Sequence, residues 1–188
     1  MSFLKRKQNL FFLLELLKKP YYKVYIKRRA KAKKIKIIGK PIIINKGLIK
    51  IGEKTQLISS SKFYGEGISP VSLYTINRNA KIEIGKNCVL QGTSIRCCNN
   101  VKIGNNVVFA ANTKIIDHDH NTDPEKRRLY ISKPIEIKDN VWIGYNVLIL
   151  KGVTIGKNSI IGAGSVVTNN IPDNSIAVGM PAKVIKKV

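Results

Sequence analysis

Aliphatic residues recur every six positions in the C-terminal third of the chain: Ile143, Ile149, Ile155, Ile161 and Val167. A period of six matches neither the helical period of about 3.6 residues nor the strand period of two. It indicates a short strand and a corner in every six residues, with three such units completing one turn. Ile143 should then stack beneath Ile161, with parallel strands about 4.8 Å apart. The pattern predicts an all-β parallel solenoid.

Small or β-branched residues occupy the fifth position of these units: Val147, Val153, Ser159 and Ser165. The same spacing extends upstream through a series of apolar positions: Ile51, Ile84, Leu90, Ile103, Phe109, Ile115 and Ile137. The register slips by about one residue near 96–102, and the stretches 59–80 and 117–134 interrupt it. Solenoids usually place insertions on one face, often the binding face. The insertion at 117–134 is polar, so we expect it to protrude.

Asparagines fall near the expected corners: Asn105, Asn106, Asn146, Asn158, Asn169 and Asn170. Asparagine and glycine tolerate the left-handed backbone that tight corners need. The repeated glycines and asparagines are therefore interpreted as corner residues.

Charge divides the chain into unequal parts. Of 34 basic and 11 acidic residues, 14 basic residues and one acid lie in residues 1–40. We expect three segments: a basic helical or capping segment at 1–40, a solenoid at 41–178 with the inserted loop 117–134, and a basic tail at 179–188.

The N-terminal segment combines a short apolar run with flanking cations. We expect a helix from about Leu4 to Lys18, ended by Pro20. Its apolar run is too short to span a bilayer, which needs about 20 residues, and no small-residue cleavage site follows it. Residues 1–36 suit an anionic membrane surface, or they cap the open end of the solenoid; both interpretations stay open. No base-reading or stacking module is visible, so we expect no nucleic-acid partner.

Cys88, Cys97 and Cys98 form an odd set without metal-ligand spacing. Small buried fillers of the solenoid are the simpler interpretation, and a catalytic thiol would need a nearby base. Reduced thiols and the lack of an export signal predict a cytoplasmic location. If residues 1–36 bind the membrane, the protein would be peripheral at its inner face.

His118 and His120 are the two histidines of the chain, and both lie in the inserted loop. A loop imidazole can act as a general base because its unperturbed pKa lies near neutrality. The positions of the two histidines in the sequence do not show whether one is a catalytic base or both are solvent-exposed loop residues without a function.

Three elements give the region from about Lys81 to Val188 a family resemblance. They are the loop that opens with "DHDH" and closes at Lys133-Pro134-Ile135, the run "DNVWIGYNVLILKGVTIGKNSIIGAGSVVTNNIPDNSIAVGMPAKVIK", and the 24-residue spacing from His118 to Trp142. Together they resemble the hexapeptide-repeat acyltransferases, particularly the maltose and galactoside O-acetyltransferases and the polysaccharide O-acetyltransferases.

The resemblance implies a left-handed parallel β-helix that works as a homotrimer, with acetyl-CoA in the cleft between neighbouring solenoids and no metal. His118 takes the place of the catalytic base. A backbone N–H in the Trp142–Tyr145 rung is expected to stabilise the oxyanion.

The resemblance also implies roles for other residues. The acceptor or the loop would be held by His120, Asp117, Asp119 and Gln91, and sequence does not decide which aspartate orients an imidazole. Gln91 stands where the sugar acetyltransferases carry an asparagine, so the acceptor should differ from a free galactoside or maltose. The residues matching cofactor positions are Trp142, Gly144, Ala163, Thr168, Lys183 and Lys186, the lysines replacing arginines near the CoA phosphates.

The function implied is acetyl-CoA-dependent O-acetylation of a sugar hydroxyl in bacterial surface polysaccharide biosynthesis, on a glycan or a nucleotide- or lipid-linked sugar. N-acetylation of a nucleotide-linked amino sugar is the nearest alternative. A γ-type carbonic anhydrase needs three histidine ligands, which the chain lacks, and a non-enzymatic solenoid is the last alternative.

Overall fold

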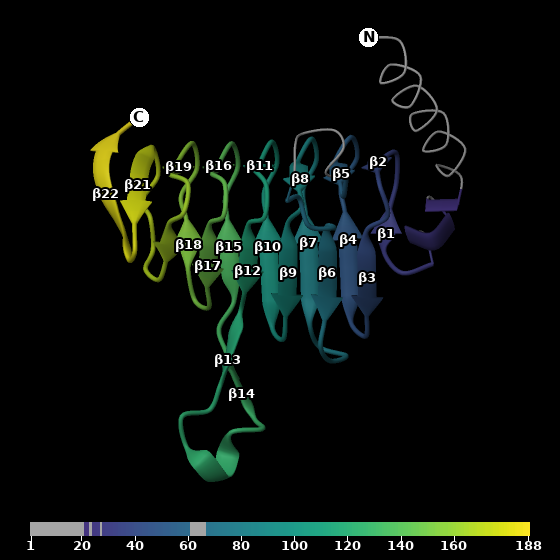
Figure 1. The fold of residues 1–188 in the computed structure, drawn as a ribbon, viewed down its shortest axis with the longest axis horizontal. Helices are drawn as coiled ribbons and strands as arrows, with labels where there is room; N and C mark the ends of the chain where they lie inside the picture. The colour runs from purple at the N-terminus through teal and green to yellow at the C-terminus, as the bar shows by residue number, and fades with distance from the viewer. Residues whose placement is uncertain (1–20, 23, 27, 61–66) are drawn as a thin grey trace.

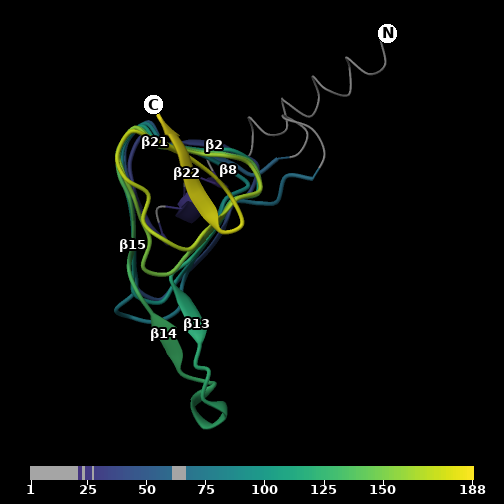
Figure 2. The ribbon, with the colours of Figure 1, turned by 90° about the vertical axis from the view of Figure 1, so that its left-hand side faces the viewer.

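The computed structural model describes residues 21–22, 24–26, 28–60 and 67–188. Its body is a three-sided prism of stacked coils, and each coil contributes one short strand to each side (Figures 1 and 2). Seen from the C-terminal end in Figure 2, the chain turns clockwise as it approaches the viewer, so the coils are left-handed. The expected fold class is confirmed.

Each side of the prism is a sheet whose coil strands are parallel. Sheet A contains β1 (Lys31–Ala32), β4 (Leu48–Ile51), β7 (Lys81–Ile84), β10 (Asn100–Ile103), β15 (Ile135–Ile137) and β18 (Thr154–Ile155). Sheet B contains β2 (Lys36–Ile38), β5 (Gln56–Ile58), β8 (Val89–Gln91), β11 (Val108–Phe109), β16 (Trp142–Ile143), β19 (Ile160–Ile161), β21 (Ser175–Gly179) and β22 (Ala182–Lys187). Sheet C contains β3 (Ile42–Asn45), β6 (Ser72–Thr75), β9 (Ser94–Cys97), β12 (Lys114–Ile116), β17 (Leu148–Leu150) and β20 (Val166–Val167).

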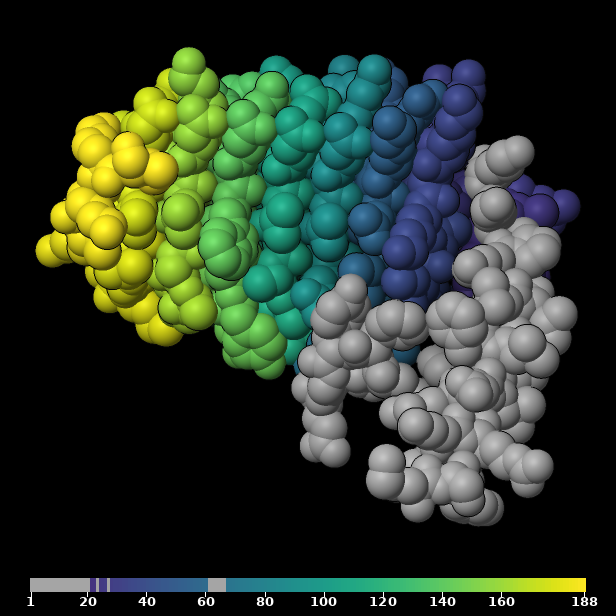
Figure 3. All heavy atoms as spheres, turned by 90° about the horizontal axis from the view of Figure 1, so that it is seen from above, coloured from purple at the N-terminus to yellow at the C-terminus, as the bar shows by residue number. Residues whose placement is uncertain are grey.

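The interior of the prism is filled by the residues that set the six-residue period. Ile143 pairs in register with Ile161, as expected, and both side chains are fully buried. The small fifth positions, including Ser159 and Ser165, are buried beside them. The buried residues of all coils form one continuous core, and burying each large aliphatic side chain contributes about 1.5–3 kcal/mol. From outside, the stacked coils are seen as parallel rows (Figure 3).

An asparagine ladder holds the corner between sheets A and B. Five asparagines there have positive φ angles between 55° and 59°: Asn87 (57°), Asn106 (57°), Asn140 (59°), Asn158 (57°) and Asn174 (55°). Each side-chain amide donates to the side-chain oxygen of the next, at 2.8–3.2 Å. All six asparagines expected at corners lie between strands. Asn106, Asn146 and Asn158 have the left-handed backbone. Asn105, Asn169 and Asn170 do not, and the side chains of Asn105 and Asn170 instead accept hydrogen bonds from the N–H groups of Lys86 (2.9 Å) and Thr154 (2.7 Å).

The solenoid departs from expectation in three places. The stretch 59–80 is not wholly an interruption, because β6 lies inside it and pairs with β3 and β9. Extra residues at the two flanking corners hid its period. The strands begin at Lys31, before the expected start at 41. The expected basic tail instead forms β22, which pairs antiparallel with β21.

The N-terminal end of the prism is closed by described residues of the 21–30 segment. Residues 21–22 and 24–26 are helical, and Tyr22, Ile26 and Ala30 belong to the buried core. The expected helix at Leu4–Lys18 lies outside the described residues. In the part of the chain that is described, no helix is both long and apolar enough to cross a bilayer.

Candidate active site

The inserted loop is a hairpin that projects from the prism where sheet C meets sheet A (Figure 1). Its arms, β13 (His118–His120) and β14 (Tyr130–Ser132), pair antiparallel, with His118 opposite Ser132. A 3-10 turn, η2 (Pro124–Lys126), closes its tip, and the Asp123 carboxylate accepts a hydrogen bond from the Glu125 N–H there (3.0 Å). The hairpin therefore holds the DHDH residues in a defined conformation.

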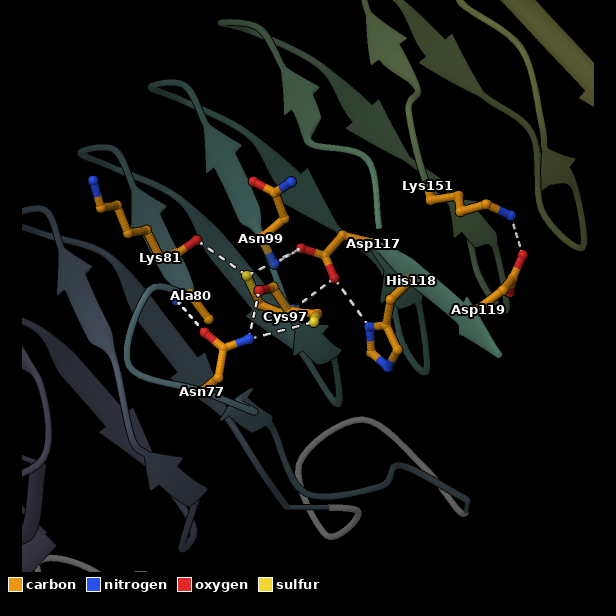
Figure 4. Close-up of polar contacts among 10 residues, drawn as sticks. Asn77, Ala80, Lys81, Cys97, Asn99, Asp117, His118, Asp119 and Lys151 are labelled. Carbon is orange, nitrogen blue, oxygen red and sulfur yellow. Dashed lines mark hydrogen bonds and ion pairs between the residues drawn. The ribbon is translucent and has the colours of Figure 1, made fainter. Parts of the chain in front are cut away.

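Asp117 joins the hairpin to the solenoid through a fully buried carboxylate. It accepts hydrogen bonds from the backbone N–H groups of Cys98 (2.7 Å) and Asn99 (2.7 Å), and from the Cys97 thiol (3.3 Å). These donors lie in the corner of the preceding coil, near the place where the sequence register slips. The Asp117 side chain is thus fixed by donors from three successive residues (Figure 4).

His118 is the side chain that Asp117 orients. Its Nδ1 lies 3.0 Å from Asp117 Oδ1, and because a carboxylate only accepts, Nδ1 carries the proton. Nε2 then bears the lone pair, and none of the described residues forms a hydrogen bond with it. The ring is 9% exposed and meets the edge of Tyr130 with centroids 4.8 Å apart. This tautomer and orientation are those that a general base requires.

Asp119 and His120 hold the hairpin. Asp119 forms an ion pair with Lys151 of the next coil and points away from His118 (Figure 4). His120 donates from Nδ1 to the backbone carbonyl of Arg127 (2.9 Å), which ties β13 to the end of η2. The structure therefore resolves the choice left open by sequence: Asp117 orients the imidazole, and Asp119 does not.

Tyr130 and Lys151 belong to the site, but sequence reasoning did not identify them. The Tyr130 ring contacts both histidines, with its centroid 5.1 Å from that of His120. The sequence showed only an aromatic residue near the end of the insertion. It did not show that Tyr130 lies on the returning arm, opposite His120. Lys151 sits at a corner of the regular repeat, so nothing in the hexad pattern distinguished it.

Most of the residues expected to bind the cofactor lie on and beside sheet B, but Thr168 follows β20 of sheet C and lies at the corner between sheets C and A. Trp142 is 56% exposed on the outer face of β16. Gly144 follows that strand, and a Cβ there would lie 2.6 Å from the backbone nitrogen of Ala163, so the close stacking of these corners requires glycine. Ala163 and Thr168 are exposed.

The remaining predicted site residues are the cofactor candidates Lys183 and Lys186 and the acceptor candidate Gln91, and they lie in different parts of sheet B. Lys183 and Lys186 are exposed on β22 and pair in register with Val178 and Ile176. Gln91 ends β8 and is half-buried, and its carbonyl accepts from the Asn112 N–H (3.2 Å). It therefore lies at the corner between sheets B and C, away from the hairpin.

The expected oxyanion donor in the Trp142–Tyr145 rung is only partly consistent with the structure. The N–H of Trp142 donates to the Ser159 carbonyl (3.0 Å), and that of Gly144 donates to the Ile161 carbonyl (2.8 Å). Both groups are used by the parallel ladder, so neither is available to an oxyanion.

One chain does not bring its two groups of site residues together. His118 leaves the prism at the edge between sheets C and A, whereas β16 and β19 run along the opposite side (Figures 1 and 2). The imidazole and Trp142 can meet only if the hairpin of one copy lies beside sheet B of another.

The buried cysteines are structural residues, as their surroundings show. Burial and the neighbouring Asp117 carboxylate raise the pKa of the Cys97 thiol, so it is a protonated donor at neutral pH and not a nucleophile. Cys88 is buried, and burial likewise raises the pKa of its thiol. Across the described ranges, no three His, Cys, Asp or Glu side chains are grouped to hold a metal ion.

Comparison with known proteins places this geometry in a family. Residues 134–169 match the family model of the bacterial transferase hexapeptide (six repeats). The galactoside O-acetyltransferase of Lactococcus lactis is 39% identical over 130 residues, which cover 56% of this chain and 63% of that protein. The galactoside O-acetyltransferase of Escherichia coli is 48% identical over 91 residues, covering 47% of this chain and 44% of that protein.

A solved structure extends the likeness further along the chain. The maltose O-acetyltransferase from Clostridium difficile superposes with a TM-score of 0.52 at 30% identity, covering 87% of this chain and 72% of that protein. The chain spans less than two thirds of the length of the two galactoside O-acetyltransferases that it matches.

Proposed function

Because the chain belongs to the hexapeptide-repeat acyltransferases, we propose that it transfers an acetyl group from acetyl-CoA to a sugar hydroxyl. One observation carries the proposal: the buried Asp117 carboxylate fixes the His118 ring so that Nε2 bears the lone pair. That dyad stands at the base of a hairpin that projects from the regular solenoid (Figure 1).

The reaction follows from this arrangement. Nε2 of His118 removes the proton from the acceptor hydroxyl as its oxygen attacks the thioester carbonyl of acetyl-CoA. The new C–O bond forms a tetrahedral intermediate, and its collapse breaks the C–S bond and releases CoA thiolate. The imidazolium then returns the proton to the thiolate sulfur. The Asp117 carboxylate stabilises the imidazolium while it exists, and holding both substrates together supplies further acceleration.

We propose that the working unit is a homotrimer. In support, sheet B presents a column of apolar residues that are Cα partners in successive coils: Val89, Val108, Trp142, Ile160 and Ile176. Val108 and Trp142 are 39% and 56% exposed in the single chain. Exposed apolar groups of this size favour a protein partner, and a neighbouring copy would bring its own His118 to the Trp142 side.

Acetyl-CoA would then lie between two copies, against the sheet B side of one of them. Trp142 is exposed beside Gly144 and Ala163, whose side chains are no larger than a methyl group and so would not keep an extended chain away from the backbone. Lys183 and Lys186 on β22 offer point charges for the CoA phosphates.

The acceptor that we propose is a sugar of a bacterial surface polysaccharide or of its nucleotide- or lipid-linked precursor. The hairpin tip supports an anionic acceptor: Lys126 pairs with Asp123, while Arg127 and Arg128 are exposed beside it. These guanidinium groups match the geometry of phosphate oxygens.

Replacing His118 by alanine tests the proposal. We expect turnover to fall by about 10²–10⁴-fold, the usual contribution of a general base, while acetyl-CoA still raises the melting temperature as it does for the wild type. The assay is release of free CoA thiol with a panel of sugar hydroxyl and amino-sugar acceptors. Turnover that survives in the variant would refute the role of His118, and exclusive use of amino sugars would point to N-acetylation instead.

A further inference from the structure

The first coil carries a concentration of positive charge that the rest of the prism lacks. Between residues 28 and 54 one acid, Glu53, accompanies ten exposed cations: Arg28, Arg29, Lys31, Lys33, Lys34, Lys36, Lys40, Lys46, Lys50 and Lys54. These residues and the helical residues 21–22 and 24–26 form the N-terminal end of the described prism, the dark blue and purple end in Figure 3. We call this region the first-coil surface.

The later coils carry more acids for each cation, with eight acidic and 16 basic residues between 67 and 188. Ion pairs there join Lys102 to Glu136 (2.8 Å) and Lys138 to Asp173 (3.4 Å). Among the described residues of the first-coil surface, Lys50 is the cation with an ion-pair partner, Glu83 at 2.9 Å. The positive potential of this end is therefore largely uncompensated, and it favours an anionic partner.

Exposed apolar and aromatic groups lie within the same surface. Tyr21 and Val24 are 60% and 51% exposed, and Ile42 and Ile44 on β3 are 47% and 42% exposed. Tyr21 stacks on Tyr25 with centroids 6.5 Å apart. Tyrosines and aliphatic groups set among cations are typical of surfaces that enter the headgroup region of a bilayer, whereas a purely electrostatic contact would not need them.

We propose that the first-coil surface docks on an anionic lipid bilayer. Its lysines and arginines would face the lipid phosphates, and Tyr21 and Val24 would enter the headgroup region. Each lysine or arginine close to an anionic leaflet adds to the attraction. Two independent properties, uncompensated charge and exposed apolar groups, thus select lipid over a polar polyanion such as RNA.

Docking in this orientation indicates which class of acceptor the enzyme would use, an inference that rests on the proposed function. In a homotrimer with parallel prism axes, three first-coil surfaces would face the same side, so a single membrane could engage all of them. The hairpins would then stand over the membrane at a fixed height. A lipid-linked sugar is the acceptor class that such an arrangement favours.

Vesicle co-sedimentation of the full chain tests the proposal. One variant combines Lys31→Gln, Lys33→Gln and Lys36→Gln, and the matched control combines Lys138→Gln, Lys157→Gln and Lys187→Gln, which remove the same charge from later coils. We expect the wild type and the control to bind vesicles of phosphatidylcholine mixed with phosphatidylglycerol and not vesicles of phosphatidylcholine alone. The first-coil variant should bind on the order of 100-fold more weakly.

A second pair of variants separates lipid from other polyanions. Val24→Ser should weaken vesicle binding, whereas Val188→Ser, at a residue 66% exposed on the opposite end, should not. Equal weakening by both lysine triples, wild-type binding by the first-coil variant, or preferential binding of RNA unaffected by Val24→Ser would overturn the proposal. Stabilisation by acetyl-CoA, measured without vesicles, should be the same in all variants, so failure of this proposal is distinguishable from failure of the proposed function.

Discussion

At the scale of single residues, Asp117 connects a structural need to a chemical one. The corner of the preceding coil leaves two backbone N–H groups directed inward, and the Asp117 carboxylate satisfies both. Thr75 does the same two coils earlier in the stack, where its Oγ1 accepts from the N–H groups of Lys46 (2.8 Å) and Gly47 (3.0 Å). A carboxylate at this position has acceptor capacity left for His118, and a hydroxyl would not.

Replacing Asp117 by asparagine affects both roles, and a control at Thr75 separates them. An N–H₂ group in place of Oδ1 favours the tautomer with the proton on Nε2, and it also leaves the Cys98 N–H without its acceptor, because both groups bond to Oδ1. We expect kcat to fall by about 10²–10⁴-fold, with little change in the affinity for acetyl-CoA. Steady-state kinetics and CoA-dependent thermal shifts measure the two effects.

Thr75→Val is the matched control for Asp117→Asn. It leaves the same kind of corner N–H groups without an acceptor, which costs about 1–3 kcal/mol, but it touches no histidine. Its kcat should stay at the wild-type value although its melting temperature falls. If both variants lose kcat in proportion to their stability, Asp117 acts only through the fold.

At the scale of elements, the corners decide how regular the coils are. The ladder from Asn87 to Asn174 combines a left-handed backbone with amide hydrogen bonds from coil to coil. The six-residue period predicted which residues face the core, because one inward position per strand is set by hydrophobicity alone. It did not predict β6, because longer corners on both sides of that strand break the six-residue spacing. Leu73 of β6 is nevertheless buried in the core like its counterparts in the other coils.

Substitutions at Asn140 measure what the ladder contributes. Its φ is 59°, and its amide joins Asn106 and Asn158 at 3.0 Å each. Asn140→Ala should lose both hydrogen bonds and strain the backbone, at about 1–3 kcal/mol of unfolding free energy. Asn140→Gly relieves the strain and should cost less. Denaturant unfolding measures both, and equal losses in the two variants would show that backbone conformation is unimportant there.

At the scale of the whole molecule, the site residues divide between two sides of the prism. Motif spacing identified His118 and Trp142, but the separation of the C–A edge from sheet B depends on the three-sided coil and on where the insertion leaves it. The sequence also could not assign the roles of Asp117 and Asp119. Each is followed by a histidine, and the direction of each side chain is known only from the structure. The sequence therefore predicted the fold and the candidate base, and the structure supplied the partners of each residue.

The proposed active site is shared between copies of the chain, and subunit complementation tests this most directly. His118→Ala removes the base, and Ala163→Trp fills the small corner where the cofactor would pass, so each variant alone should be inactive. Co-expressed in equal amounts, they should form some interfaces with an intact His118 facing an intact Ala163, and recover about a quarter of wild-type turnover by random pairing in a closed ring. Mixed assemblies with no recovered turnover would contradict the account, because a site contained within one chain cannot be restored by two defective ones.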